Sequence, residues 1–137
     1  MSAASEPRLL LVEDHEDLAD ATAEFLRSEG LAVQVASTGA EALTAAVAFR
    51  PDIVLCDLNL LDMTGFEIAR LLRKNPVTSG TLFAIHTVLT DADICAFERE
   101  VPQGYVNLYL SKPMTVEKLE RLLAAFESLR QSRTKVD

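Results

Sequence analysis

The sequence predicts an α/β fold in which a five-stranded parallel sheet carries helices on both faces. Five short apolar runs alternate with segments whose apolar residues recur at helical spacing, and turn residues separate them. The first run, residues 9–12, is continuously apolar, which is typical of a parallel strand buried on both faces. The five expected strands are residues 9–12, 31–36, 52–57, 82–87 and 105–110.

The connections between the strands restrict their order. Strands that alternate with helices pair in parallel, and right-handed crossovers leave few topologies. The best candidate is the doubly wound, flavodoxin-like (βα)5 arrangement with strand order 2-1-3-4-5. In that order the first and third strands are neighbours, and open α/β sheets bind their ligands at such a switch point.

Start and stop signals indicate the first three helices. After the run 9–12, apolar residues at 18, 25 and 26 form one stripe, and Gly30 supplies the left-handed position at which helices commonly end. Two later pairs have the capping-box spacing that opens a helix. These pairs are Thr38 with Glu41 and Thr64 with Glu67. The Asn-Pro pair at 75–76 then closes the third helix.

The last third of the chain is less regular. A weaker helix is expected over residues 91–100, and Pro102 and Gly104 interrupt it before the fifth strand. A final helix starts at Thr115 and carries Leu119 and Leu122 on its apolar stripe.

Length and composition predict one domain. The chain has 137 residues and 49% hydrophobic content, so we expect a core over about residues 8–130 with flexible ends at 1–7 and 131–137. A net charge of −8 argues against direct, non-specific binding to nucleic acid or anionic membranes. Because the chain shows neither a long apolar stretch nor a signal-peptide pattern, a cytoplasmic location is expected.

Several of the expected strands end in chemically reactive residues. Glu13 and Asp14 follow the first strand, and Asp57 ends the third. Thr87 ends the fourth strand, and Lys112 follows the fifth. Because parallel strands end at the same edge of a sheet, we expect three carboxylates, a hydroxyl and an ammonium to converge there.

This set of side chains suits phosphoryl transfer. Three neighbouring carboxylates repel one another, and an all-oxygen site suits a hard divalent cation such as Mg²⁺ or Mn²⁺. An aspartate can attack phosphorus and form an acyl phosphate. Lys112 and Thr87 could then bind the phosphoryl oxygens, one as a point charge and one through its hydroxyl.

The chain resembles the receiver (response-regulator) domain of two-component signalling, either as a stand-alone protein or as part of a hybrid histidine kinase. Each matching stretch is weak by itself, but five in order are specific. The stretches are Leu-Leu-Val-Glu-Asp at 10–14, Pro-Asp-Ile-Val-Leu-Cys-Asp at 51–57, Asp-Met-Thr-Gly-Phe-Glu at 62–67, Ile-His-Thr at 85–87 and Leu-Ser-Lys-Pro at 110–113.

The resemblance implies a phosphorylation switch that assists its own phosphorylation and dephosphorylation without being a turnover enzyme. Asp57 matches the aspartate that takes a phosphoryl group from a histidine kinase or a phosphotransfer protein. Glu13 and Asp14 match the acidic pair that holds Mg²⁺. The backbone carbonyl of Asn59 matches a further metal ligand.

The remaining matched positions belong to the response to phosphorylation. Thr87 matches the switch hydroxyl, and Lys112 matches the phosphate anchor, whose bond to Pro113 is commonly cis. Tyr109 lies where an aromatic rotamer reports phosphorylation. The family's output surface, formed by the fourth helix, fifth strand and fifth helix, implies a protein partner there, with the chain itself a monomer or weak dimer.

Three departures from the family pattern concern the surroundings of these positions. Leu61 stands where a proline is common, and Val88 stands where a small residue is common. The β-branched Val88 could narrow access to the phosphoryl group and slow its transfer or hydrolysis. Residues 98–107 lack the usual small-residue pattern.

Two alternative functions stay open at this point. A degenerate receiver would act only as a protein-interaction module, although Asp57 and Lys112 are both retained. An aspartyl-phosphate phosphatase would carry a second aspartate two residues after the nucleophile, where this chain has Asn59. His15 is expected at the surface at the start of the first helix, and His86 is given no role.

Overall fold

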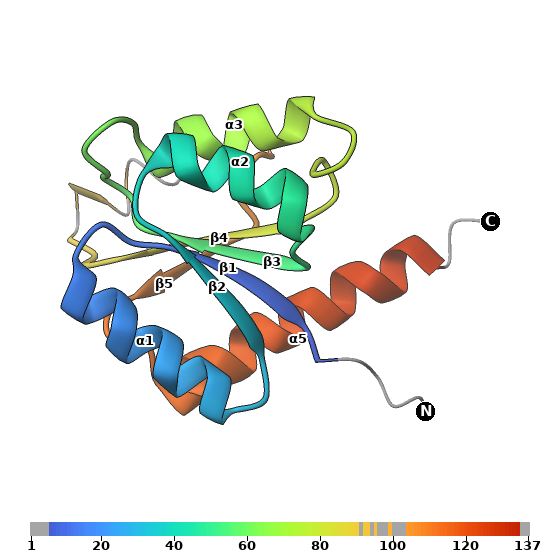
Figure 1. Cartoon of the computed structure of the whole chain (residues 1–137). Coiled ribbons are helices and arrows are strands. Elements are labelled where there is room, and N and C mark those ends of the chain that lie inside the picture. Colours follow the sequence, from blue (N-terminus) through green and yellow to red (C-terminus); the bar gives the residue numbers. More distant parts are fainter. Residues whose placement is uncertain (1–5, 91, 94, 96–98, 100–103, 135–137) are drawn as a thin grey trace.

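The computed structural model describes the chain except for residues 1–5, 91, 94, 96–98, 100–103 and 135–137. In the described part, five parallel strands form one sheet in the order β2-β1-β3-β4-β5, which confirms the predicted topology (Figure 1). The strands are β1 (Arg8–Val12), β2 (Ala32–Ala36), β3 (Ile53–Cys56), β4 (Leu82–Thr87) and β5 (Leu108–Ser111).

Helices cover both faces of this sheet. In Figure 1, α2 and α3 lie on one face and α1 and α5 on the other. Their bounds are Glu16–Ser28 for α1, Gly39–Phe49 for α2, Gly65–Lys74 for α3 and Val116–Thr134 for α5. The helix expected over residues 91–100 falls largely outside the described residues, so that prediction stays open.

Two apolar cores flank the sheet because successive strand residues point to opposite faces. Leu10 and Val12 belong to the core under α2 and α3, whereas Leu9 and Leu11 belong to the core under α1 and α5. All four are at most 2% exposed. The continuous apolar runs therefore supply both cores at once, which is why they do not alternate with polar residues.

The helix ends follow the predicted signals with one difference. Gly30, at a φ of 97°, ends α1, and Leu31 N–H donates to the Leu26 carbonyl beyond it. The capping box of Thr64 and Glu67 is complete at the start of α3. At α2, Thr38 caps the helix as expected, but the Glu41 carboxylate accepts from the N–H of residue 37 and not from that of Thr38.

Strand β5 is shorter than predicted, since it begins at Leu108 and not at residue 105. The Tyr105 carbonyl is engaged by the Arg73 guanidinium, which approaches from α3. Asn107 bonds the β4 residue Phe83 through its side-chain oxygen as well as its backbone N–H. A side chain thus replaces the backbone carbonyl in the ladder, and regular pairing starts only after it.

None of the described helices combines the length and apolar content that a bilayer span requires.

Candidate functional site

The register of the strands brings Glu13 and Asp57 together. Val12 pairs with Cys56 across β1 and β3, and the Asp57 N–H donates to the Val12 carbonyl at 2.9 Å. Glu13 and Asp57 are the next residues along these neighbouring strands. They leave the sheet at the same level, as expected for the switch point of a doubly wound sheet.

Asp14 completes a cluster of three carboxylates with these two residues. One oxygen from each of Glu13, Asp14 and Asp57 lies within 4.8 Å of the others. Glu13 is only 4% exposed, so its charge is poorly screened by water. A close set of carboxylate oxygens, partly buried and mutually repelling, is the donor chemistry of a hard divalent cation site.

Lys112 reaches the same cluster from the end of β5. Its Nζ lies 2.7 Å from Glu13 Oε1 and 3.5 Å from Asp57 Oδ2. The side chains of Lys112 and Asp57 are each 14% exposed, and that of Glu13 is 5% exposed. The ammonium is therefore a largely desolvated charge that partly offsets the carboxylate repulsion.

The protonation equilibrium of Asp57 reflects these neighbours. Burial raises the pKa of the Asp57 carboxyl above its ordinary value, and the negative charge of Glu13 raises this pKa further. Lys112 and a hydrogen bond from the Leu58 N–H to Asp57 Oδ1, at 2.8 Å, act in the opposite direction. Burial likewise raises the pKa of the adjacent Cys56 thiol, which keeps this thiol protonated beside the site.

Thr87 and Lys112 lie on the neighbouring strands of the same edge. Thr87 pairs with Ser111 across β4 and β5, and the Lys112 N–H donates to the Thr87 carbonyl at 2.9 Å. Thr87 is 9% exposed, and the peptide bond between Lys112 and Pro113 is cis, as expected. Tyr109 is half-buried on β5.

Helix α3 begins close behind Asp57 because residue 65 is a glycine. A Cβ on Gly65 would lie 2.8 Å from the Asp57 carbonyl oxygen and 2.7 Å from Ile85 Cδ1. The Gly65 N–H donates to the Leu58 carbonyl at 2.7 Å. The loop between β3 and α3 therefore folds back tightly, with the exposed Asn59 on it.

Two of the three departures from the family pattern, Leu61 and Val88, are solvent-facing, and the third, residues 98–107, falls partly outside the described residues. Leu61, in the loop after β3, is 91% exposed, and Val88, directly after β4, is 68% exposed. Neither side chain is needed to fill a core.

Three residues that the sequence reasoning did not single out make notable contacts. Asp62 accepts hydrogen bonds from the first two backbone N–H groups of α2. Arg73 bonds four residues on two segments of chain, 79 and 81 before β4 and 105 and 107 before β5. His86 is 3% exposed, and burial lowers its pKa to about 4. Only the family spacing around Asp62 hinted at any of them.

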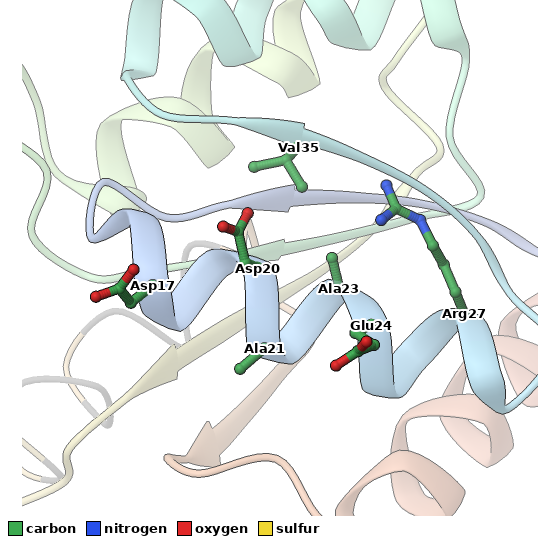
Figure 2. Close-up of a pocket in the computed structure, with 7 residues that line it drawn as sticks. All are labelled: Asp17, Asp20, Ala21, Ala23, Glu24, Arg27 and Val35. Atoms are coloured by element: carbon green, nitrogen blue, oxygen red, sulfur yellow. The ribbon is translucent and has the colours of Figure 1, made fainter.

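A separate surface cavity of about 630 Å³ lies between α1 and β2. Figure 2 shows its lining side chains, which come from α1 with the exception of Val35 on β2. The lining includes acidic residues, while the Arg27 guanidinium donates to the Val33 carbonyl of β2. The three clustered carboxylates do not line this cavity, so the cavity is separate from the candidate site.

Comparison with known proteins gives a consistent result. The family model described as response regulator receiver domain matches residues 9–124. The DNA-binding response regulator MtrA of Mycolicibacterium smegmatis is 40% identical over 84 residues, which cover 61% of this chain and 36% of that protein. The transcriptional regulatory protein TrcR of Mycobacterium tuberculosis is 33% identical over 82% of this chain and 42% of its own length. The chain thus spans less than half of these relatives.

Solved structures share the fold along most of the chain. A putative response regulator from Chloroflexus aurantiacus aligns with a TM-score of 0.78 and 28% identity, over 89% of this chain and 98% of that one. The chemotaxis response regulator CheY4 of Vibrio cholerae aligns with a TM-score of 0.76 and 26% identity, over 88% and 98% of the two chains. The sheet edge that holds the clustered carboxylates lies within the matched family range.

Proposed function

Because this chain belongs to the response regulator receiver domain family, which works as a phosphorylation-dependent signalling switch, we propose that Asp57 is the residue that accepts the phosphoryl group. The observation that carries this assignment is the position of Asp57 between an acidic pair and a lysine. Its carboxylate shares a cluster with Glu13 and Asp14, and Lys112 Nζ lies 3.5 Å from its Oδ2.

Glu13, Asp14 and Asp57, with the backbone carbonyl of Asn59, would hold the metal ion, Mg²⁺ or Mn²⁺. The fit rests on the all-oxygen donor set and on the repulsion among three partly buried carboxylates. When bound, such an ion neutralises charge on the phosphoryl oxygens.

The two oxygens of Asp57 have different surroundings. Oδ1 accepts the Leu58 N–H, whereas Oδ2 faces Lys112. In the transfer, an Asp57 oxygen forms a bond to phosphorus while the P–N bond of a phosphohistidine donor breaks. The bonding electron pair leaves with the imidazole, which retains or takes up a proton. Lys112 and Thr87 then bind oxygens of the new acyl phosphate.

The acyl phosphate changes the charge at the strand ends. It adds about −1.5 to −2 charge at neutral pH, together with strong acceptor oxygens. The Lys112 N–H donates to the Thr87 carbonyl, so a backbone movement at the end of β4 would also shift the residue that follows β5. Tyr109 lies on β5, the strand that ends directly before Lys112, and we propose that the rotamer of its aromatic ring reports phosphorylation. Hydrolysis of the acyl phosphate resets the switch.

The proposed partners follow from this chemistry. A histidine kinase or a phosphotransfer protein supplies the phosphoryl group. An output protein reads the face that includes β5 and α5. The relatives named as DNA-binding extend well beyond the matched range, and we propose no direct nucleic-acid contact for this region, whose net charge is −8.

Intact-mass measurement with acetyl phosphate and Mg²⁺ tests the assignment. The parent protein should gain the mass of one phosphoryl group, and Asp57→Asn should not. Asp20→Asn, which changes an exposed aspartate on α1, is the matched control and should label like the parent. A parent that fails to label would favour the interaction module, and sustained catalytic turnover of a phosphoryl substrate would favour the phosphatase.

A further inference from the structure

The loop between β3 and α3 contains a small hairpin. Asn59 and Thr64 form an antiparallel bridge, and the Leu60 N–H donates to the Met63 carbonyl at 3.1 Å. Residues 61–62 therefore occupy the tip of the hairpin. The leucine at this tip is 91% exposed, so its side chain does little to hold the hairpin in place.

Asp62 supplies the contact that its neighbour lacks. Its Oδ1 accepts the Gly39 N–H at 2.8 Å, and its Oδ2 accepts the Ala40 N–H at 3.0 Å. These are the first two residues of α2, whose N–H groups have no acceptor within their own helix. The two hydrogen bonds lower the pKa of the Asp62 carboxyl, so the carboxylate is charged at the positive end of the helix dipole.

Met63 reinforces the same attachment with an apolar contact. A Cβ on Gly39 would lie 2.3 Å from Met63 Cγ and 2.6 Å from its Sδ. The missing side chain at the start of α2 therefore makes room for the methionine. Two consecutive loop residues thus contact one helix end, one through a carboxylate and one through packing.

We propose that Asp62 is a positioning residue of the metal site, which attaches the hairpin to α2 and thereby holds the Asn59 carbonyl in place. This inference rests on the proposed function, because it concerns the same metal. The family's common proline at position 61 would restrict the backbone of this turn. In this chain Leu61 does not restrict the backbone in this way. The two hydrogen bonds from Asp62 to α2 restrict the turn in place of the proline.

The expected consequence is a change in metal affinity. A carbonyl ligand on a mobile hairpin must be ordered when the metal binds, and this ordering weakens binding. Loss of an outer partner of a metal ligand typically weakens affinity about 10- to 100-fold. Asp62 lies three residues after Asn59 and makes its hydrogen bonds to α2, so it acts on only one proposed ligand and acts indirectly. We therefore expect about a 10-fold weakening, at the lower end of that range.

Mg²⁺ titration followed by amide NMR shifts near Asp57 measures this affinity. Asp62→Ala should raise the Kd for Mg²⁺ by about 10-fold. Asp62→Asn should raise it less, because the carboxamide oxygen can still accept one of the two hydrogen bonds. Amide hydrogen exchange at residues 39 and 40 should accelerate in Asp62→Ala, which reports the loss of the attachment independently of the metal.

Thr38→Ala is the matched control. Thr38 Oγ1 accepts the Glu41 N–H at 3.0 Å, so this variant weakens the same end of α2 without changing the hairpin. Its Kd for Mg²⁺ should equal that of the parent. An equal loss of affinity in Thr38→Ala and Asp62→Ala would overturn the inference, since helix stability would then explain both.

Two other outcomes would also contradict the positioning role of Asp62. The first is unchanged affinity in Asp62→Ala, and the second is unaccelerated exchange at residues 39 and 40. A parent protein with no saturable response to Mg²⁺ would instead remove the proposed metal site itself. The two failures are therefore distinguished by the parent titration.

Discussion

The Lys112 ammonium lies nearer to Glu13 than to Asp57. Its Nζ is 2.7 Å from Glu13 Oε1 and 3.5 Å from Asp57 Oδ2. The lysine therefore compensates the charge of Glu13, a proposed metal ligand, more strongly than that of Asp57, the proposed phosphoacceptor. A bound cation would compete with Lys112 for the Glu13 and Asp57 carboxylates, and a phosphoryl group would compete with these carboxylates for the Lys112 ammonium.

This arrangement predicts how Lys112→Met affects stability. Without a divalent cation, removal of the ammonium leaves the buried Glu13 without its ion-pair partner, so we expect a loss of about 3 kcal/mol in the free energy of unfolding. In saturating Mg²⁺ the loss should be smaller, because the cation compensates the same carboxylates. Urea unfolding in EDTA and in Mg²⁺ checks this, and equal losses in both buffers would contradict it.

Val88 provides a prediction about rates. Because its branched side chain follows the proposed switch threonine, Val88→Ala should accelerate labelling by acetyl phosphate or hydrolysis of the product severalfold. The exposure of Val88, 68%, keeps the expected stability change within about 0.5 kcal/mol. Val47→Ala changes another exposed valine, near the C-terminal end of α2 and so toward the opposite edge of the sheet, and should leave both rates unchanged. Rates equal to the parent in Val88→Ala would rule out a role in access.

His86 predicts a component of acid sensitivity. Its pKa falls to about 4, chiefly through burial and secondarily through the charge of Lys112. The neutral imidazole is favoured in the folded state, so its contribution is complete above the unfolded value of about 6.5. As the pH falls from 6.5 toward 4, the folded protein should lose about 3 kcal/mol from this group.

The variant His86→Leu should remove this component. Urea unfolding between pH 7 and pH 4 should show a shallower fall in stability for the variant than for the parent, over about 2.5 pH units. The carboxylates titrate in both proteins, so the difference between the two curves isolates the histidine. Parallel curves would show that its buried position does not control the response to acid.

Arg73 predicts a loss of stability remote from the chemical site. Its guanidinium bonds the Tyr105 carbonyl and the Asn107 side chain, and with them fixes the entry into β5. An ammonium cannot reproduce this planar set of donors, so Arg73→Lys should cost about 2 kcal/mol. Arg70→Lys, on the exposed face of the same helix, should change stability by less than about 0.5 kcal/mol. Chemical denaturation of both variants measures the difference.

The elements that local pattern controls could be predicted from the sequence. The apolar run of β3 and the capping box at Thr64 depend on residues within a few positions of each other. The convergence of Glu13 and Asp57 was also predictable, because parallel pairing and the switch point follow from the alternation of strands and helices. The cluster of three carboxylates is thus a consequence of topology that the sequence pattern contains.

Contacts between distant residues were decided only by the tertiary structure. Asp62 reaches backbone N–H groups 22 and 23 positions away, and Arg73 reaches residues 32 and 34 positions away. The later start of β5 and the burial of His86 depend in the same way on what packs against them. The alternating pattern was enough to predict the existence and order of the strands and the residues at their C-terminal ends. Only the packed structure determined which long side chains meet which backbone groups, because their geometry depends on loops and helix ends that no local pattern specifies.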